Sequence, residues 1–597
     1  MVKTDMLTLR TILFPEKEVC SVQELYYRTA EGVASYSSPG GVLTVDGRAA
    51  FDTYFNVLPV VKYKEYCCLT SLFLKLRLSG SFVVQIFGVS HGEDGFTERC
   101  ILRSDACSAV EKEFVFDISQ ALDGGCDNVY FTLTSEGGSF FGGSFEGECE
   151  YTHDVRLAVV ICTFRREKYL LSNHRKICSY LYSGSNFTTD NIHFYIVDNG
   201  RTLNGSDIEN EYVTLIPNKN TGGSGGFTRG YYEAVNSGRG YTHILFMDDD
   251  IILDCEMLLR VCALLRARKN GFEGLSAGGT MLRASDRITV HEAGSFWDGR
   301  RLNSIGNGCV VTDRTAVLEA AYYPKGNYHA WWFYCFPSDW QEKHGYPLQF
   351  FIKEDDIEYS LRCAEEIAVL IGIAVWHDDF DGKYDGFQEY YIKRNELIMT
   401  SVNDQKPYAL FQVRKLILSV MKQTVYQRYF LADIIFRAYD DYLKGWEHFY
   451  NVDTAALNTE LMSSCEPLVS DEELLEKYGV YFDEEKYLVS LSEPENNKKQ
   501  ALSLNGYLIP YVFYKKDRDG FAMTDLAKCR IVNFYRHRKV LHYDIQRKKG
   551  FVTVQKKRKL FANIFRLIFR SVKFLILYPS VRKGYRSHMK ELSSKTE

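Results

Sequence analysis

The sequence predicts an α/β core, preceded by an N-terminal antiparallel β-sandwich and followed by a mainly helical C-terminal region. Short β-forming runs with glycine-rich turns fill roughly the first 150 residues. Apolar strand-like runs then alternate with helical stretches, which is the pattern of a mostly parallel sheet. Beyond about residue 400, helical periodicity replaces this alternation. We therefore expect three domains with the boundaries 1–152, 153–400 and 401–597.

The N-terminal region contains runs such as Phe73–Leu78, where apolar residues alternate, and Val129–Leu133, which is more continuously apolar. Glycine-rich turns such as Ser135–Gly138 follow these runs. Short strands separated by turns of this kind predict an antiparallel β-sandwich. A carbohydrate-binding role and a purely architectural role both remain open for it.

From about residue 153 the strand-like runs are apolar almost throughout, as in Arg156–Cys162, His193–Val197 and Ile244–Met247. Such runs are typical of buried parallel strands. Polar residues follow each run, and in open α/β sheets ligands bind at the carboxyl ends of the strands. The sequence therefore predicts a nucleotide site at that edge of the sheet.

Three consecutive aspartates, Asp248, Asp249 and Asp250, follow the run Ile244–Met247. Adjacent carboxylates repel one another unless a cation lies among them, and alternate ones can reach a Mg²⁺ or Mn²⁺ that also holds a substrate's phosphates. His377, after a later apolar run, can supply an imidazole ligand. The alternatives are a solvated acidic turn and a buried histidine whose hydrogen bonds are satisfied.

A glycine-rich stretch, Asn220–Gly230, precedes the aspartates. Its glycines permit tight turns and a close approach of backbone N–H groups to a diphosphate, with which Arg229 could pair. The stretch is neither a Walker loop nor a GxGxxG motif after a first strand. A flexible surface loop is an equal alternative.

A tryptophan pair, Trp331 and Trp332, precedes a carboxylate pair, Asp355 and Asp356, that opens a predicted helix. Inverting sugar transfer needs a carboxylate that deprotonates the acceptor hydroxyl, a second group that holds the acceptor, and aromatic faces that stack on sugar rings. Two core tryptophans are the alternative for the first pair.

Taken in order, these motifs resemble the GT-A glycosyltransferases of family 2, and more narrowly the polymerising galactofuranosyltransferases of the actinobacterial cell wall. The resemblance is densest from about residue 155 to 400. It implies a Rossmann-like GT-A core, a UDP-sugar donor, a glycan or lipid-linked glycan acceptor, and Mn²⁺ or Mg²⁺ as the cofactor.

The resemblance also implies a role for each matching residue. Asp248, Asp250 and His377 would bind the metal, and Asp356 would be the catalytic base beside Asp355 as an acceptor contact. The residues expected at the nucleotide and donor sugar are Arg166, Asp198, Asn199, Arg229 and Asp249. Those expected at the acceptor are Trp331, Trp332, His291, Glu292 and Glu354.

Two positions depart from the family pattern. Glu354 stands where a tryptophan is expected directly before the carboxylate pair, and Ser295 stands where a glutamate is expected, with Glu292 three residues earlier. Both positions concern acceptor recognition. They leave the reaction type in place and the acceptor open.

The composition is that of a globular protein, with 46% hydrophobic and 25% charged residues. The 16 cysteines lack zinc-site spacing, and the first 15 residues lack the apolar core of a signal peptide, so we expect a cytosolic protein with reduced thiols.

The segment from Lys528 onward is basic, and its apolar run Leu560–Leu577 is interrupted by cations. This pattern favours a peripheral amphipathic helix on anionic lipid at the inner face of the membrane. Nucleic acid is the competing partner, but no nucleic-acid-binding module is visible, and we expect none to bind.

We therefore expect a metal-dependent inverting glycosyltransferase that transfers galactofuranose from UDP-galactofuranose to a lipid-linked or cell-surface polysaccharide. We expect it to form a homo-oligomer. One alternative is a family 2 enzyme with a rhamnosyl, glucosyl or galactopyranosyl nucleotide as donor. Another is a non-catalytic glycan-binding protein. The presence of all the candidate metal ligands and of Asp356 argues against this alternative.

Overall fold

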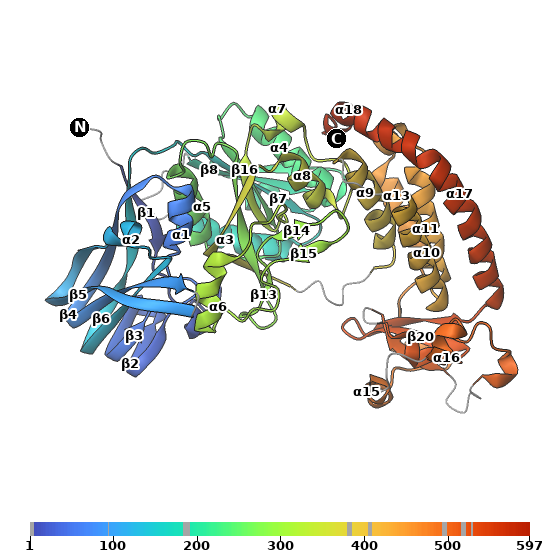
Figure 1. Cartoon of the computed structure of the whole chain (residues 1–597), viewed down its shortest axis with the longest axis horizontal. Helices are drawn as coiled ribbons and strands as arrows, with labels where there is room; N and C mark the ends of the chain where they lie inside the picture. Colours follow the sequence, from blue (N-terminus) through green and yellow to red (C-terminus); the bar gives the residue numbers. More distant parts are fainter. Residues whose placement is uncertain are drawn as a thin grey trace. The chain divides into compact units, whose positions relative to one another are not determined.

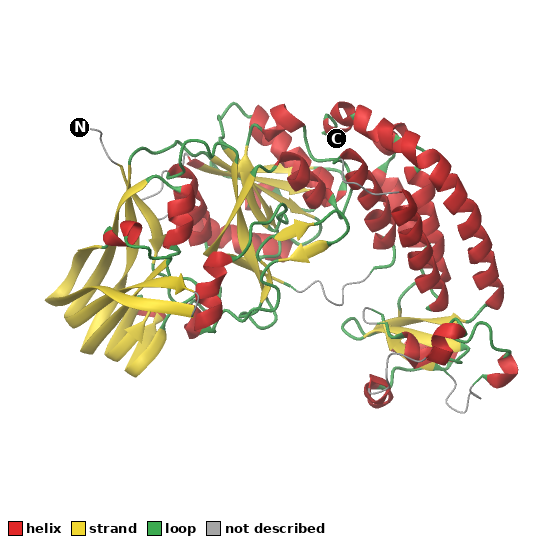
Figure 2. Cartoon of the chain, viewed as in Figure 1, coloured by secondary structure: helices red, strands yellow, loops and turns green. Residues whose placement is uncertain are grey.

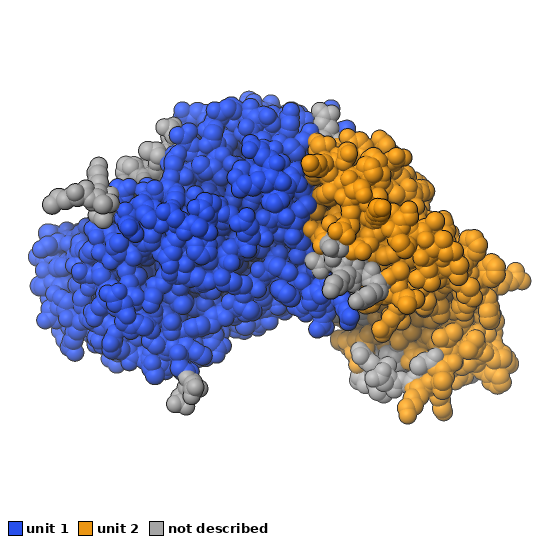
Figure 3. Space-filling model, turned by 45° about the horizontal axis from the view of Figure 1, so that its top comes forward, with its two compact units in different colours: residues 1–347, 359–379, 596–597 blue, residues 348–358, 380–595 orange. Residues whose placement is uncertain are grey.

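The computed structural model describes residues 5–92, 95–182, 191–378, 385–403, 409–491, 498–514, 521–526 and 529–596. The chain forms two compact units, shown in different colours in Figure 3. The first unit comprises residues 1–347, 359–379 and 596–597, and the second comprises residues 348–358 and 380–595. The segment with Asp355 and Asp356 thus belongs to the same unit as the C-terminal region.

The N-terminal part of the first unit is an antiparallel sheet of six strands (Figure 1). The strand order is β2-β3-β6-β4-β5, and β1 pairs with β6. The strands are β1 (Asp5–Thr11), β2 (Arg28–Ser37), β3 (Val42–Ala50), β4 (Leu69–Gly92), β5 (Gly95–Asp117) and β6 (Asn128–Cys149). The predicted antiparallel β architecture is confirmed. The structure adds that the strands hydrogen-bond as one sheet, in which register shifts interrupt the pairing of the long strands β4 and β6.

Two buried arginines join this sheet to the core that follows it. Arg10, on β1, donates hydrogen bonds from its guanidinium to the carbonyls of Val57 and Ile371. Arg260, in the core, donates from Nη1 to the carbonyl of Gly372 at 2.7 Å and from Nη2 to the carbonyl of Thr11, on β1, at 2.8 Å. Ile371 and Gly372 lie in the strand that ends at His377. The N-terminal region therefore helps to fix a strand that carries a candidate metal ligand.

The core of the first unit is a mixed sheet of nine strands. Eight of them have the order β11-β17-β12-β16-β10-β7-β8-β9, and the ninth, β13, pairs with β12. Strands β9, β8, β7 and β10 are parallel, and β16 runs antiparallel between β10 and β12. The strands are β7 (Leu157–Thr163), β8 (Ile192–Asp198), β9 (Val213–Pro217), β10 (His243–Asp248), β11 (Ile252–Leu253), β12 (Leu275–Arg283), β13 (Val290–Glu292), β16 (Phe333–Pro337) and β17 (Glu366–His377). The predicted α/β core with a mostly parallel sheet is confirmed, and a short hairpin of β14 (Ser295–Trp297) and β15 (Leu302–Ser304) lies outside the sheet.

Helices follow the strands of this core as the sequence pattern predicts. They are α3 (Glu167–Tyr182), α4 (Gly222–Asn236), α5 (Glu256–Arg266), α6 (Arg314–Glu319), α7 (Trp340–His344) and α8 (Asp355–Cys363). Two short helices, α1 (Val60–Tyr66) and α2 (Gln120–Asp123), lie within the N-terminal region. The interior is rich in aromatic side chains, among them Tyr231, Phe246, Phe336 and Trp340. Much of the high aromatic content is therefore core.

The second unit is largely helical, as expected, but it also contains a sheet that the sequence analysis missed (Figure 2). The helices are α9 (Gln388–Val402), α10 (Ala409–Val425), α11 (Tyr429–Tyr442), α12 (Trp446–Asn451), α13 (Thr454–Ser463), α14 (Asp471–Tyr478), α15 (Glu484–Leu491), α16 (Lys498–Leu502), α17 (Lys557–Ser587) and α18 (Met589–Ser593). The four-stranded sheet has the order β18-β21-β20-β19, from β18 (Val469–Ser470), β19 (Ala522–Asp525), β20 (Lys539–Asp544) and β21 (Lys549–Val554). Within the described residues, no helix combines the length and apolarity needed to cross a membrane.

Candidate active site

The aspartate triplet lies at the carboxyl end of β10, in the middle of the core sheet. Ile244, Leu245, Phe246 and Met247 are at most 1% exposed, so the strand is fixed by burial on both faces. Asp248 is in register with Cys162 of the parallel neighbour β7. The chain leaves the sheet here, and the three carboxylates follow the buried strand at the edge where α/β sheets bind ligands.

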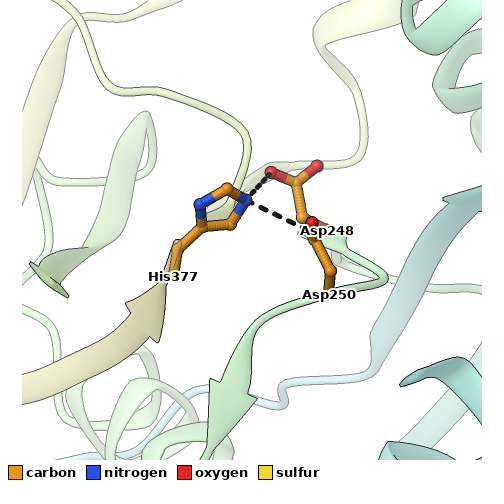
Figure 4. Close-up of side chains that lie close together, drawn as sticks. All are labelled: Asp248, Asp250 and His377. Atoms are coloured by element: carbon orange, nitrogen blue, oxygen red, sulfur yellow. Dashed lines mark ion pairs between the residues drawn. The ribbon is translucent and has the colours of Figure 1, made fainter. Parts of the chain in front are cut away.

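Asp248, Asp250 and His377 converge on one point, as Figure 4 shows. The Nε2 atom of His377 lies 3.0 Å from Oδ1 of Asp250 and 3.8 Å from Oδ2 of Asp248. One candidate ligand atom from each residue lies within 4.8 Å of the others. The Nδ1 atom of His377 is hydrogen-bonded to the carbonyl of Asp378 at 2.7 Å, which fixes the ring with Nε2 toward the carboxylates.

The electrostatics of this cluster favour a cation. Burial raises the pKa of Asp248 to about 7, with Asp250 and Asp249 adding to the shift and His377 opposing it. Burial alone would lower the pKa of His377, but its hydrogen bond to Asp250 and the charges of Asp248 and Asp250 raise that pKa to about 9. Positive charge is therefore stabilised at this point, and two carboxylates with one imidazole are ligands that Mn²⁺ and Mg²⁺ accept. The residues fit a divalent cation.

Asp249 is turned away from this cluster and holds the ends of two strands together. Its carboxylate accepts hydrogen bonds from Thr163 Oγ1, at the end of β7, at 2.6 Å and from Arg166 Nη1 at 3.2 Å. Arg166 also pairs with Asp250 at 2.5 Å. Asp249 is 5% exposed and orders the ends of these strands, and its predicted contact with the donor sugar stays a prediction. The side chain of Arg166 is 48% exposed, and its predicted contact with the nucleotide stays a prediction.

Asp198 and Asn199, predicted to bind the nucleotide, are buried and shape the loop that follows β8. The carboxylate of Asp198 accepts the N–H groups of Gly200, Thr202 and Leu203 at 2.7–2.9 Å. Asn199 donates to the carbonyl of Gly222 at 2.8 Å. It also accepts a hydrogen bond from Asn218 at 2.9 Å. These bonds join three separate segments, and sequence reasoning missed Asn218 because its partner lies in another loop.

The glycine-rich stretch is not a loop, which corrects the expectation of tight turns around a diphosphate. Helix α4 begins at Gly222 and includes the remaining glycines. A Cβ atom on Gly226 would lie 2.2 Å from Sγ of Cys162, and one on Gly230 would lie 2.3 Å from Cγ1 of Val160. The glycines therefore let the helix pack closely on β7. Arg229 pairs with Glu233 at 2.8 Å along the same helix, and its contact with a diphosphate stays a prediction.

Trp331 and Trp332 are 4% and 6% exposed, so both take the core position that was their alternative. Trp331 packs on Phe246, with ring centroids 4.9 Å apart. Trp332 donates from Nε1 to the carbonyl of Gly279 at 3.1 Å. The indole N–H of Trp331 has no hydrogen-bond partner in the part of the chain that the structure describes, and the predicted acceptor contact of the two tryptophans stays a prediction.

The other acceptor candidates of the first unit lie on β13. The ring of His291 is 6.4 Å from that of Trp332, so these two predicted residues are neighbours. Glu292 is 4% exposed and accepts a hydrogen bond from Ser304 Oγ at 2.8 Å. Glu292 therefore braces β13 against β15 as well as lying beside His291.

In the second unit, Glu354, Asp355 and Asp356 stand at the start of α8. Burial raises the pKa of Glu354 to about 8. The negative charges of Glu396 and Asp356 add to this shift, and the positive charge of Lys415 opposes it. Burial and the charge of Asp356 raise the pKa of Asp355 to about 8. Asp356 is half-buried, and its Oδ1 accepts the N–H of Ile357 at 2.8 Å. Adjacent carboxyl groups in different environments can take different protonation states and hence different roles.

A mixed α/β sheet with a carboxylate–histidine cluster at its edge is compatible with the core of a GT-A glycosyltransferase, and comparison with known proteins supports that class. A family model described as "Glycosyl transferase family 2" matches residues 158–275. A second model, "Galactofuranosyltransferase 2 N-terminal", matches residues 9–141. The chain is a glycosyltransferase, and the resemblance predicted from its motifs is confirmed.

Two curated relatives are galactofuranosyltransferases. The chain is 27% identical over 442 residues to galactofuranosyltransferase GlfT2 of Mycobacterium tuberculosis, covering 69% of this chain and 68% of the relative. It is 25% identical over 444 residues to GlfT2 of Mycolicibacterium smegmatis, covering 69% and 66%. Among solved structures, a mannosyltransferase of Pyrobaculum calidifontis aligns with 52% of this chain and 79% of its own at 11% identity, with a TM-score of 0.29 that is too low to argue from.

Proposed function

We propose that the enzyme transfers galactofuranose from UDP-galactofuranose to a glycan acceptor, with inversion, and that Asp248, Asp250 and His377 hold the Mn²⁺ or Mg²⁺ that it needs. The observation that carries this proposal is the convergence of three ligand atoms within 4.8 Å at the carboxyl end of β10. The similarity to galactofuranosyltransferases on both sides of this motif supports the choice of sugar.

When bound, the cation would neutralise the diphosphate of the donor and the charge that develops on the leaving UDP. In the proposed reaction, Asp356 takes the proton from an acceptor hydroxyl, and Asp355 orients that acceptor. The hydroxyl oxygen forms a bond to the anomeric carbon on the face opposite UDP. The bond from that carbon to the UDP oxygen breaks, and UDP leaves with the electron pair.

The proposed acceptor is a lipid-linked or surface polysaccharide. Glu354 and Ser295 replace the tryptophan and glutamate of the family pattern at acceptor positions. A carboxyl group in place of an indole exchanges a stacking surface for a hydrogen-bonding group, so we expect an acceptor with a different pattern of hydroxyls from that of the relatives.

We also retain the three domains 1–152, 153–400 and 401–597, a homo-oligomeric state and action at the inner face of the membrane as parts of this proposal.

A panel of UDP-sugars tests the donor. We expect the purified enzyme with Mn²⁺ to release UDP from UDP-galactofuranose faster than from UDP-glucose or UDP-galactopyranose, when galactofuranosyl and galactopyranosyl acceptors are present. Faster turnover of another donor would show that the proposed sugar is wrong and that the proposed type of reaction is right. If no donor reacts, calorimetry with UDP and Mn²⁺ decides the alternative of a glycan-binding protein, which predicts no metal-dependent UDP binding.

The C-terminal helix supports a peripheral membrane location. One face of α17 exposes only apolar side chains, between 54% and 73% exposed and at helical spacing: Phe561, Phe565, Ile568, Phe569, Val572 and Ile576. We call this the apolar face of α17. The three cations inside the run point elsewhere, because Arg566 pairs with Asp433, and Arg570 and Lys573 pair with Asp440. Exposed cations lie near the helix ends, at Lys556, Arg558 and Lys583, and Lys573 is exposed in the middle of the helix although it pairs with Asp440.

We expect the double variant Phe565→Glu/Phe569→Glu to bind anionic phospholipid vesicles at least about tenfold more weakly, because each phenylalanine buried in lipid contributes about 1.5–3 kcal/mol. Vesicle co-sedimentation measures the effect. The matched control is Leu475→Glu, an exposed apolar residue on α14. If the double variant binds vesicles normally but loses self-association, the apolar face is instead a contact between copies of the chain.

A further inference from the structure

The segment that leads into the carboxylate pair has a strained backbone. Phe351, Lys353 and Glu354 have φ angles of 76°, 67° and 68°, in the left-handed region that residues with a Cβ atom rarely adopt. Strain of this kind persists only where the surrounding structure holds the chain in place. Asp355 and Asp356 follow directly, so whatever holds this segment also sets the position of both carboxylates.

Asn395, on α9, holds the segment. It is fully buried, and its Nδ2 atom lies 3.2 Å from the carbonyl oxygen of Phe350 and 2.9 Å from those of Ile352 and Lys353. One amide group thus binds three carbonyls of a four-residue stretch. In a segment with three left-handed residues, these three carbonyl oxygens lie within hydrogen-bond distance of one amide nitrogen, which shares its two hydrogens among them.

Arg394 fixes the amide of Asn395 and binds the same segment. Its Nε donates to Oδ1 of Asn395 at 2.9 Å, and its Nη2 donates to the carbonyl of Phe350 at 3.1 Å. The guanidinium lies over the ring of Tyr390, 5.1 Å from the centroid, and over that of Phe449 at 5.2 Å. Arg394 is 3% exposed, so this arrangement is inside the second unit and shielded from water.

The other side of the segment is also fixed. The ring of Phe351 stacks on that of Tyr391 with centroids 5.3 Å apart, and both belong to the core of the second unit. The carbonyl of Glu354 accepts the N–H of Glu358 at 2.9 Å, which closes the first turn of α8. Hydrogen bonds therefore run without a break from α9 through the strained segment to the helix that carries Asp355 and Asp356.

We propose that Arg394 and Asn395 are positioning residues for sugar transfer, which hold the strained segment 350–354 so that the carboxylate of Asp356 meets the acceptor hydroxyl in a reactive orientation. The inference rests on the proposed role of Asp356 as the base. It assigns part of the catalytic geometry to the helices after residue 380, in addition to the sheet that carries the aspartate triplet.

Asn395→Ala tests the inference, because this variant should lower kcat without weakening the binding of the donor. We expect kcat to fall about 100-fold, since a displacement of about 1 Å in a catalytic group has effects of this size. The affinity for UDP in Mn²⁺ and the KM for the donor should stay within about twofold of wild type, because neither depends on this segment. If Asn395→Ala does not fold, Arg394→Lys removes the hydrogen bond to Asn395 while keeping the charge over the rings, and it should show the same split.

The matched control is Asn563→Ala. Asn563 is also a buried asparagine of the second unit, and it donates to Thr424 Oγ1 at 2.8 Å without touching the segment. We expect it to lower the thermal midpoint to a similar degree and to keep wild-type kcat. Wild-type kcat in Asn395→Ala, or an equal loss in Asn563→Ala, would overturn the inference. If Asp356→Asn retained activity, the proposed base would fail instead, so the two failures are distinguishable.

Discussion

Replacing Asp356 with asparagine is expected to abolish sugar transfer and to leave UDP binding nearly intact. The amide has almost the shape of the carboxylate but cannot accept the proton of the acceptor hydroxyl. General base catalysis contributes about 10²–10⁴-fold to rate, so kcat should fall by that factor or more. Steady-state release of UDP measures kcat, and calorimetry with UDP in Mn²⁺ measures binding.

The control for this variant is Asp471→Asn. Asp471 is likewise an aspartate in the first turn of a helix, α14, where it accepts a hydrogen bond from the hydroxyl of Tyr543. The same chemical change at that place should leave kcat unchanged. Turnover of Asp356→Asn at the wild-type rate would remove Asp356 from the role of base. Loss of UDP binding in that variant would show that the substitution disturbs more than the proton transfer.

The strand β10 and the aspartates at its end could be predicted because their signal is local. Ile244–Met247 is uniformly apolar, and the aspartates that follow cannot be buried without compensation, so they mark the end of the strand; β10 ends at the first of them, Asp248. The same reasoning found His377 at the end of β17, although the sequence alone does not show that it faces the aspartates. That convergence depends on the order of the strands, since β10 and β17 are separated by β16 and β12 in the sheet.

The glycine-rich stretch shows where local reasoning fails. Glycine has a low helix propensity, so Gly222–Gly230 favours a loop on its own. Tertiary packing reverses this preference, because only glycine lets the helix approach Cys162 and Val160 of β7 so closely. The tryptophan pair is ambiguous for a related reason, since an aromatic side chain is equally suited to a sugar face and to a core.

The hydrogen-bonded residues around the site could not be predicted, because their partners are distant in sequence. Asn199 binds the carbonyl of Gly222, and Asn395 binds carbonyls more than 40 residues before it. In the sequence each is an ordinary polar residue near a predicted element. Only the fold shows that Asn199 shapes the loops at the carboxyl edge of the sheet and that Asn395 holds the segment before Asp355.

Replacing Asp250 with asparagine is expected to weaken UDP binding about 100-fold in the presence of Mn²⁺, which corresponds to about 2.7 kcal/mol. Asp250 supplies one of the two carboxylates of the cluster and lies 3.0 Å from Nε2 of His377. A neutral amide is a poor ligand for a hard cation, so less metal would be held where the diphosphate binds. Calorimetry with UDP, in Mn²⁺ and in EDTA, measures the difference.

The comparison with EDTA gives this prediction its specificity. If Asp250 acts through the metal, the UDP affinity of the variant in Mn²⁺ should approach that of the wild type in EDTA. The control is Asp254→Asn, because burial raises the pKa of the Asp254 carboxyl to about 7 and asparagine is close in shape to its neutral form. That variant should keep metal-dependent binding. Unchanged UDP affinity of Asp250→Asn in Mn²⁺ would exclude Asp250 from the metal site, and the cluster with His377 would then be an ion pair that supports the sheet edge.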